Sequence, residues 1–251
     1  MKIIGSDYDG TLNHGGIDEK KKDAIKKWRE KGNVFSVVSG RGAEALYEIY
    51  KDKDFECDFL VADNGAVIMK PDGEIVSQVK CDSSILTSLC DYLFEVGCDW
   101  ADVHAEKVLL IIPDNKEKEI GKEIHLKDMP ETEYFTQVST MLETVEESEK
   151  ITALVREKFG DFLNPLQNGR CIDIVRQDMN KAKGMYNLAS LFSLGHDDII
   201  TVGDNINDRD MIKEFRSYAM ESGVKEIKEI ATFITESVTD LIEKELQEQK
   251  K

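Results

Sequence analysis

Residues 3–12 read IIGSDYDGTL, an apolar run that ends on two aspartates, Asp7 and Asp9. This opening predicts a buried strand over residues 2–6, with the acidic groups at or just beyond its carboxyl end. On an extended backbone, side chains at positions i and i+2 point the same way, so the two carboxylates are expected side by side. Their repulsion needs an opposing charge. A divalent cation would supply it, whereas a solvated turn at Asp9-Gly10 is the simpler alternative.

The segment that follows predicts a strand–helix–strand unit. Residues 17–32 carry their apolar side chains on one side and end at a glycine, as an amphipathic helix does, and residues 33–38 are again apolar. Residues 58–62 predict a third strand, and residues 66–79 a hairpin that turns at Pro71-Asp72-Gly73. This rhythm is typical of a parallel sheet, whose ligands lie at the carboxyl ends of the strands.

The rhythm of alternating strands and helices resumes after about residue 180, but the region between the two halves differs from both. There the sequence predicts helices over residues 84–97 and 148–160, a strand over 107–113, and a hairpin whose Asn168-Gly169 suits a type I′ turn. We therefore expect an α/β protein with a Rossmann-like parallel sheet core, formed by residues 1–79 and 179–251. An α+β domain, residues 80–178, is expected as an insertion into that core.

The amino-acid composition limits the classes of protein and of binding partner that fit this sequence. The 251 residues include 41% hydrophobic ones, enough for a sizeable core, and the formal net charge of −17 disfavours nucleic acid or an anionic membrane as a partner. No stretch approaches the ~20 apolar residues that cross a bilayer. The five cysteines include no C-x-x-C pair and are expected to be reduced. These features predict a cytoplasmic protein, and they leave its oligomeric state open.

A second acidic stretch, TVGDNINDRDM at residues 201–211, again follows an apolar strand. Loops after neighbouring parallel strands converge at one edge of the sheet, so Asp204 is expected close to Asp7 as a further ligand of the cation. Asn207 or Asp208 could instead simply cap the next helix, and one role does not exclude the other.

Two weaker motifs suit the binding of an anion. Ser39 and Gly40 follow the second strand, where glycines let backbone N–H groups approach an oxyanion. Lys181 and Lys183 open a predicted helix, a position where cations are electrostatically unfavourable without a compensating anion.

In this order, the four segments DYDGT, VVSG, KAKG and GDNIND resemble the motifs of the haloacid dehalogenase (HAD) superfamily. The long segment between Ser39 and Lys183 is similar to the class-two cap of the Cof-like sugar-phosphatase subgroup. The resemblance implies a Mg²⁺-dependent phosphatase that hydrolyses small phosphate monoesters, such as sugar or other metabolite phosphates. It also implies that the residues selecting the substrate lie in the cap.

Carried onto this chain, the resemblance implies that Asp7 is the nucleophile and forms an aspartyl-phosphate. Asp9 would protonate the leaving alcohol and then activate water, and Lys183 would neutralise the phosphoryl group. Asp7, the backbone carbonyl of Asp9, and Asp204 would hold Mg²⁺. Covalent catalysis of this kind splits phosphoryl transfer into two easier steps.

The remaining implied roles concern binding and orientation. Ser39 and Gly40 would bind the phosphoryl group, which Asn207 would also touch. Thr11 and Asp208 would orient the charged network; these last assignments, like the others, follow from the resemblance.

Other interpretations stay open at this point. Asn64, in the DNGA segment that matches the subgroup, would face the substrate or belong to an ordinary turn before the hairpin. A phosphomutase of the same superfamily, or a noncatalytic sensor of a phosphorylated metabolite, would use the same pocket. The presence of both Asp7 and Asp9 disfavours the sensor, because binding alone does not require an acid–base carboxylate.

Overall fold

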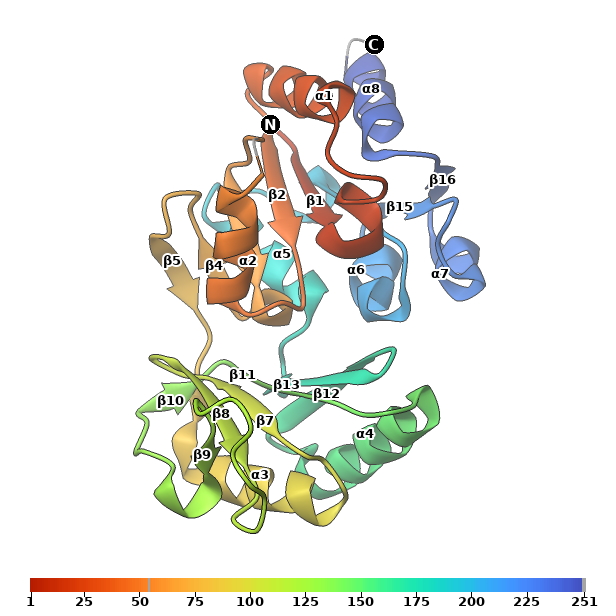
Figure 1. Cartoon of the computed structure of the whole chain (residues 1–251). Coiled ribbons are helices and arrows are strands. Elements are labelled where there is room, and N and C mark those ends of the chain that lie inside the picture. The colour runs from red at the N-terminus through yellow and green to blue at the C-terminus, as the bar shows by residue number, and fades with distance from the viewer. Residues whose placement is uncertain (54, 250–251) are drawn as a thin grey trace. The chain divides into compact units, whose positions relative to one another are not determined.

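The computed structural model describes residues 1–53 and 55–249. Its internal contacts divide the chain into two compact units, which are drawn together in Figure 1. One, called the core unit below, consists of Met1–Ser77 and Asn180–Lys251, and the other, the inserted unit, is Gln78–Met179. The inserted unit thus interrupts the core unit once.

The core unit is built on a mainly parallel sheet with the strand order β16-β15-β14-β1-β2-β3-β4-β5. Every pairing from β16 to β3 is parallel, and β3 pairs with β4 antiparallel. The α/β fold class predicted from the sequence is confirmed. The strands are β1 (Ile3–Asp7), β2 (Val34–Val38), β3 (Phe59–Ala62), β4 (Val67–Met69), β5 (Ile75–Gln78), β14 (Ile199–Gly203), β15 (Arg216–Met220) and β16 (Phe233–Thr235).

Helices cover both faces of this sheet because successive strand residues point to opposite sides. Ile4 of β1 packs into a core shared with Trp28 and Leu241, whereas Ile3 packs with Met185 and Met211 on the other face. The first face is covered by α1 (Glu19–Glu30), α2 (Ala43–Lys51) and α8 (Val238–Glu248). The second is covered by α5 (Lys181–Ser190), α6 (Arg209–Glu214) and α7 (Lys225–Ile230).

The inserted unit is an α+β layer with its own core. Its main sheet has the order β12-β13-β11-β7-β8-β9, and Val103 and Val138 from this sheet pack with Leu89 and Val155 from the two helices. Strands β10 and β6 pair with each other in a separate two-stranded sheet. The elements are β6 (Cys81–Asp82), α3 (Leu86–Glu95), β7 (Ala101–His104), β8 (Val108–Ile112), β9 (Ile124–His125), β10 (Tyr134–Phe135), β11 (Gln137–Met141), α4 (Val145–Phe159), β12 (Leu163–Asn168) and β13 (Cys171–Arg176).

The hairpin between β12 and β13 differs in detail from the prediction. Asn168 pairs with Cys171, so the two-residue loop is Gly169-Arg170 and not Asn168-Gly169. Gly169 has φ +58°, and Arg170 is not among the residues with positive φ. A positive φ at the first loop residue alone is the pattern of a type II′ turn, in which glycine takes the first position. The predicted type I′ turn is therefore wrong by one residue.

Membrane-spanning helices are absent from the part of the chain that the structure describes, because none is long and apolar enough to cross a bilayer. The helix α4, for example, has 15 residues, whereas a spanning helix needs about 20.

Candidate active site

The site forms where β1 and β14 end side by side. The two strands pair in parallel, with Ser6 opposite Val202, so the next residues along each strand reach the same edge of the sheet. Asp7 is the last residue of β1, and Asp204 follows directly after β14. The short turn Ile206–Asp208 then brings a third carboxylate back toward them. Adjacent parallel strands thus deliver acidic groups that are almost 200 residues apart in sequence.

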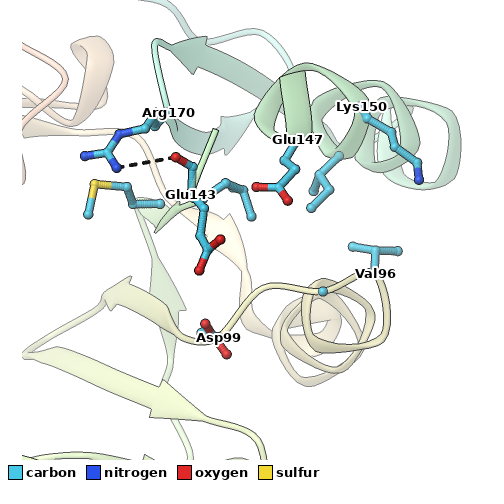
Figure 2. Close-up of a pocket in the computed structure, with 10 residues that line it drawn as sticks. Val96, Asp99, Glu143, Glu147, Lys150 and Arg170 are labelled. Atoms are coloured by element: carbon cyan, nitrogen blue, oxygen red, sulfur yellow. Dashed lines mark hydrogen bonds between the residues drawn. The ribbon is translucent and has the colours of Figure 1, made fainter. Parts of the chain in front are cut away.

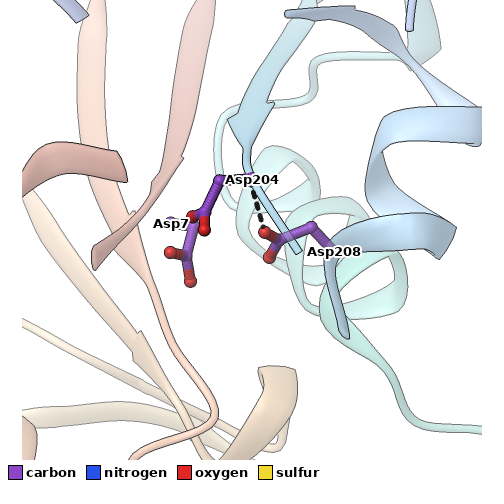
Figure 3. A group of neighbouring side chains, drawn as sticks. All are labelled: Asp7, Asp204 and Asp208. Atoms are coloured by element: carbon purple, nitrogen blue, oxygen red, sulfur yellow. Dashed lines mark hydrogen bonds between the residues drawn. The ribbon is translucent and has the colours of Figure 1, made fainter. Parts of the chain in front are cut away.

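Three carboxylates meet at this edge. Asp7, Asp204 and Asp208 each offer an oxygen, and these oxygens all lie within 4.8 Å of one another. Figure 3 shows the three side chains turned toward a common space. Asp7 and Asp208 are buried, whereas Asp204 is half-buried. Because like charges repel strongly away from water, this cluster requires positive charge close by.

Lys181 supplies one such charge from the first residue of α5. Its Nζ donates to Oδ1 of Asp7 at 2.7 Å and to Oδ1 of Asp208 at 2.5 Å, and its side chain has no exposure to solvent. Burial alone lowers the pKa of Lys181, but Asp208 and Asp7 together raise it above its ordinary value. The lysine is therefore charged, and it holds the two aspartates at a fixed spacing.

Lys183, the lysine to which the sequence assigned this role, lies elsewhere. Its side chain is exposed, and its backbone N–H donates to the side chain of Asn180, which caps the helix. Residues two apart on a helix point about 200° apart, so Lys181 and Lys183 cannot share a face. The spacing of Met185 and Leu188, four and seven residues after Lys181, indicates that the buried face begins at Lys181. The prediction of Lys183 is corrected to Lys181.

Backbone amides and a hydroxyl group complete the acidic cluster. Oδ2 of Asp208 accepts hydrogen bonds from the N–H groups of Asp204, at 2.9 Å, and Asn205, at 3.2 Å. Thr11 donates its hydroxyl to Oδ1 of Asp204 at 2.6 Å. Both oxygens of Asp208 are thus engaged, and each bond holds a neighbouring part of the cluster. Thr11 and Asp208 lie in positions that suit the orienting roles expected for them.

The pKa values of Asp7 and Asp204 are both raised, chiefly by burial. Burial, followed by repulsion from Asp208, holds the pKa of Asp7 well above its usual range, although Lys181 opposes this shift. Burial also raises the pKa of Asp204, against the lowering effect of the Thr11 hydroxyl. Lys181 therefore offsets only part of the cost of burying the Asp7 carboxylate beside its acidic neighbours.

Two glycines make room for the cluster. A Cβ atom on Gly10 would lie 2.4 Å from Oδ2 of Asp204, and one on Gly203 would lie 2.5 Å from Oδ2 of Asp208. Gly10 also has φ +82°, in the left-handed region that glycine adopts without strain. A side chain at either position would displace a carboxylate.

Asp9 is oriented differently from the side-by-side arrangement expected for it. The strand ends at Asp7, and the loop Tyr8–Leu12 that follows turns sharply, with Gly10 at φ +82°, so residue 9 is not part of the paired strand. The Asp9 carboxylate instead accepts two hydrogen bonds from Arg41, from Nε at 2.7 Å and Nη2 at 2.9 Å. About half of the Asp9 side chain is exposed. Arg41, which the sequence analysis did not select, therefore opposes the charge of Asp9.

The other predicted residues surround the same strand ends. Ser39 is buried after β2, and its Oγ accepts a hydrogen bond from the N–H of Arg41 at 3.1 Å, with Gly40 between them. Asn207 is half-buried in the turn that ends at Asp208. Asn64 is buried in the turn Asp63–Gly65, where its N–H donates to the carbonyl of Ser39.

A separate hollow of about 500 Å³ lies in the inserted unit (Figure 2). Arg170, at the hairpin tip, lines it and directs Nη1 toward the carbonyl of Glu143 at a long 3.5 Å. Acidic side chains outnumber basic ones around it, so its lining does not favour an anionic ligand. Its lining residues are Val96, Gly97, Asp99, Met141, Leu142, Glu143, Glu147, Lys150, Ile151 and Arg170.

The chain is similar to known proteins over nearly its whole length. The chain is 25% identical to the 5-amino-6-(5-phospho-D-ribitylamino)uracil phosphatase YwtE of Bacillus subtilis, over 94% of this chain and 93% of that protein. It is 21% identical to the phosphatase YwpJ of the same organism, over 94% of each chain. A haloacid dehalogenase-like hydrolase from B. subtilis shares its fold with a TM-score of 0.81, at 17% identity over 97% of this chain and 99% of that one.

A family model described as haloacid dehalogenase-like hydrolase matches residues 4–241, which is nearly the whole chain. The resemblance predicted from the four motifs is confirmed, and with it the expectation of a phosphoric monoester hydrolase. The protein belongs to the haloacid dehalogenase-like hydrolase family.

Proposed function

We propose that the protein is a Mg²⁺-dependent phosphatase that hydrolyses small phosphate monoesters through an aspartyl-phosphate. The observation that carries the proposal is the position of Lys181 between Asp7 and Asp208, with Asp204 completing a cluster of three carboxylates. Phosphoryl transfer depends mainly on positioning and on neutralising charge, and this cluster provides a fixed nucleophile beside a buried cation.

The donor set of the cluster suits a small, hard divalent cation. Three carboxylates against one ammonium group leave an excess of negative charge, and Lys181 and two backbone amides already engage both oxygens of Asp208. Asp7 and Asp204 are then the side chains that would hold Mg²⁺, with the backbone carbonyl of Asp9 as a third ligand. When bound, the ion would neutralise charge on the phosphoryl oxygens and on the attacking carboxylate.

The side chains would divide the chemistry between two steps. In the first, a carboxylate oxygen of Asp7 bonds to phosphorus, the bond from phosphorus to the alcohol oxygen breaks, and Asp9 gives a proton to that oxygen. In the second, Asp9 takes a proton from water as the water oxygen bonds to phosphorus, and the bond from phosphorus to the Asp7 oxygen breaks, which releases phosphate and restores the Asp7 carboxylate. Lys181 and Ser39 would hold the transferring group throughout, and Asn207, in the turn that carries Asp208, would assist them.

Arg41 is expected to hold Asp9 in the ionised form that takes the proton from water in the second step, and Asp9 would have to be protonated and leave Arg41 to act in the first. Its two hydrogen bonds fix the direction of the Asp9 carboxylate, which is partly exposed to solvent. A planar guanidinium that grips both carboxylate oxygens restricts rotation more than a single hydrogen bond would. We therefore include Arg41 as a positioning residue of the proposed mechanism.

We propose small phosphorylated metabolites, among them sugar phosphates, as the substrates, and the cytoplasm as the compartment. The names of the relatives support the substrate class, since YwtE is named for a phosphoribityl compound. Cys57, Cys90 and Cys98 are buried free thiols, which suits a reducing compartment.

The decisive experiment is a phosphate-release screen with Mg²⁺ over a panel of phosphorylated metabolites that includes sugar phosphates and the compound named for YwtE. Asp7→Asn is the control, because an amide cannot act as the nucleophile. We expect free phosphate in equal yield with the alcohol. Isomerised sugar phosphate as the main product would indicate a phosphomutase, and binding without release would indicate a sensor.

A further inference from the structure

The turn Asp63–Gly65 has an unusual backbone. Three successive residues have positive φ, at +50° for Asp63, +51° for Asn64 and +100° for Gly65, and all three are buried. Asparagine and aspartate tolerate this region better than other side chains, but two such residues in a row remain uncommon. Strained backbone of this kind tends to persist where the surrounding structure requires it.

This turn holds the segment that carries Ser39 and Arg41. The N–H of Asn64 donates to the carbonyl of Ser39 at 3.1 Å, and the N–H of Asp63 donates to the carbonyl of Arg41 at 2.9 Å. The N–H of Ser39 in turn donates to the carbonyl of Val61, at 2.8 Å. Two successive N–H groups of the left-handed turn thus hold the backbone on either side of Gly40, including the residue that carries the Ser39 hydroxyl.

The same turn also contacts the helix that carries Lys181. A Cβ atom on Gly184 would lie 2.5 Å from the Cα atom of Gly65, and one on Gly65 would lie 2.6 Å from the carbonyl oxygen of Asn180. Asn180 is the N-cap of α5, and Lys181 is its first residue. Two glycines therefore let the backbones of the turn and the helix touch within one helical turn of Lys181.

We propose that the turn Asp63–Gly65 is a positioning element that sets the spacing between Ser39 and Lys181, so that both reach the same phosphoryl group. This proposal rests on the proposed function. It assigns Asn64 a role through its backbone, in place of the substrate contact that was one of two interpretations of the sequence, and it makes Gly65 and Gly184 positioning residues. The spacing matters because a misplacement of about 1 Å can cost 10²-fold in rate.

The first test adds one methyl group at the contact. Gly184→Ala places a Cβ against Gly65, whereas Gly195→Ala, also in the core unit, places it in open space and serves as the matched control. We expect Gly184→Ala to lower kcat by roughly 10- to 100-fold and the control to retain the wild-type value. The melting temperature of each variant shows whether the assay temperature leaves the protein folded.

Inhibition by two anions separates positioning from general damage. Orthovanadate forms five-coordinate adducts that resemble the transition state, so its affinity requires Ser39 and Lys181 at the correct spacing together, whereas inorganic phosphate resembles the ground state. Gly184→Ala should weaken vanadate inhibition in proportion to the loss of kcat/KM and change phosphate inhibition much less. Equal weakening of both anions, or unchanged kcat per folded molecule, would overturn the proposal.

A second pair of variants tests the positioning role of the turn even if Gly184→Ala does not fold. Asn64→Ala and Asn64→Gly both remove the side chain, but glycine adopts φ +51° freely and alanine does not. We expect Asn64→Gly to recover most of the kcat and vanadate affinity that Asn64→Ala loses. Equal losses in the two variants would mean that the Asn64 side chain itself acts, and the positioning role would be rejected.

The failure of this inference can be told apart from that of the proposed function. If the wild-type protein releases phosphate from no substrate of the panel, the proposed phosphatase activity is wrong, whatever the variants do. If the wild-type protein is active and Gly184→Ala matches it in kcat and vanadate inhibition, the phosphatase stands and the positioning role is wrong.

Discussion

The ammonium group of Lys181 lies 2.5 Å from Oδ1 of Asp208, and neither side chain is exposed to solvent. Asp208 also accepts hydrogen bonds from the backbone of Asp204 and Asn205, so it is held before any substrate arrives. Lys181 reaches Asp7 from this anchored position. A buried charge that is paired on two sides keeps its direction, which suits the contact with a phosphoryl oxygen that we propose for Lys181.

The two lysines of α5 give a direct test of the corrected assignment. Lys181→Met should reduce turnover by roughly 10²- to 10³-fold, because it removes the buried positive charge beside Asp7. Lys183→Met alters an exposed side chain and should leave turnover within about twofold of wild type. Steady-state kinetics of both variants with the same substrate measures the contrast. The reverse ranking would restore the assignment made from the sequence.

Lys181→Met should also lower stability, by about 3–5 kcal/mol in the absence of a metal ion. The loss follows because Asp7 and Asp208 would remain buried without their shared partner. Urea unfolding monitored by circular dichroism would measure it, with Lys183→Met as the matched control. A stability equal to that of the control would show that the ion pairs contribute little.

Removal of divalent cations should abolish turnover, and added Mg²⁺ should restore it, because Asp7 and Asp204 offer hard oxygen ligands that lack a full complement of positive charge. Mg²⁺ should also raise the melting temperature of the wild-type protein by binding the folded state. That rise should shrink in Asp204→Asn. Full activity after EDTA treatment and desalting would contradict the metal requirement.

The raised pKa of Asp7 predicts how the stability of the metal-free protein varies with pH. Burial makes the folded protein hold a proton on Asp7 at pH values where the unfolded chain has lost it. The folded state then binds more protons than the unfolded state, so stability falls as pH rises above the ordinary carboxyl value near 4. Asp7→Asn removes this contribution. Urea midpoints without metal should therefore decline more steeply with pH for wild type than for Asp7→Asn, and parallel curves would refute the shift.

Asp9→Asn should slow turnover by roughly 10²- to 10⁴-fold, the range typical of a lost general acid–base group. KM should change much less, because the variant keeps Lys181 and Ser39. Arg41→Ala should reduce kcat to a smaller extent through the orientation of Asp9, and it should change stability by less than about 1 kcal/mol, since the ion pair is partly exposed. A loss of substrate affinity without a loss of kcat in Asp9→Asn would argue against the acid–base role.

Much of the fold followed from the sequence because its signals are local. The apolar runs at Ile3-Ile4 and Ile199-Ile200 end on acidic residues, and parallel pairing brings Asp7 and Asp204 to the same edge of the sheet. The side-by-side arrangement expected from strand alternation failed at Asp9, because the strand ends at Asp7 and a loop follows.

The errors arose where a contact depends on the direction of a side chain. Lys181 and Lys183 differ by two residues, and only the phase of the buried face of α5 separates them. That phase could have been read from Met185 and Leu188. The partner of Asp9 could not, because Arg41 lies 32 residues away on another loop, and no local pattern indicates that pairing. The loop of the β12–β13 hairpin shifted by one residue because the strand register, and not the Asn-Gly dipeptide, determines it.

The two glycines that border the acidic cluster bear on how related proteins could lose activity during evolution. At Gly203 the space for the Asp208 carboxylate exists only because a hydrogen atom stands where other residues carry a side chain, and Gly10 does the same for Asp204. A single mutation from glycine to alanine could therefore silence an enzyme of this type while every charged residue stayed in place. In related sequences, the presence of the aspartates alone would therefore not identify an active enzyme. The residues at the positions of Gly10 and Gly203 would help to distinguish active enzymes from relatives that bind a ligand without catalysis.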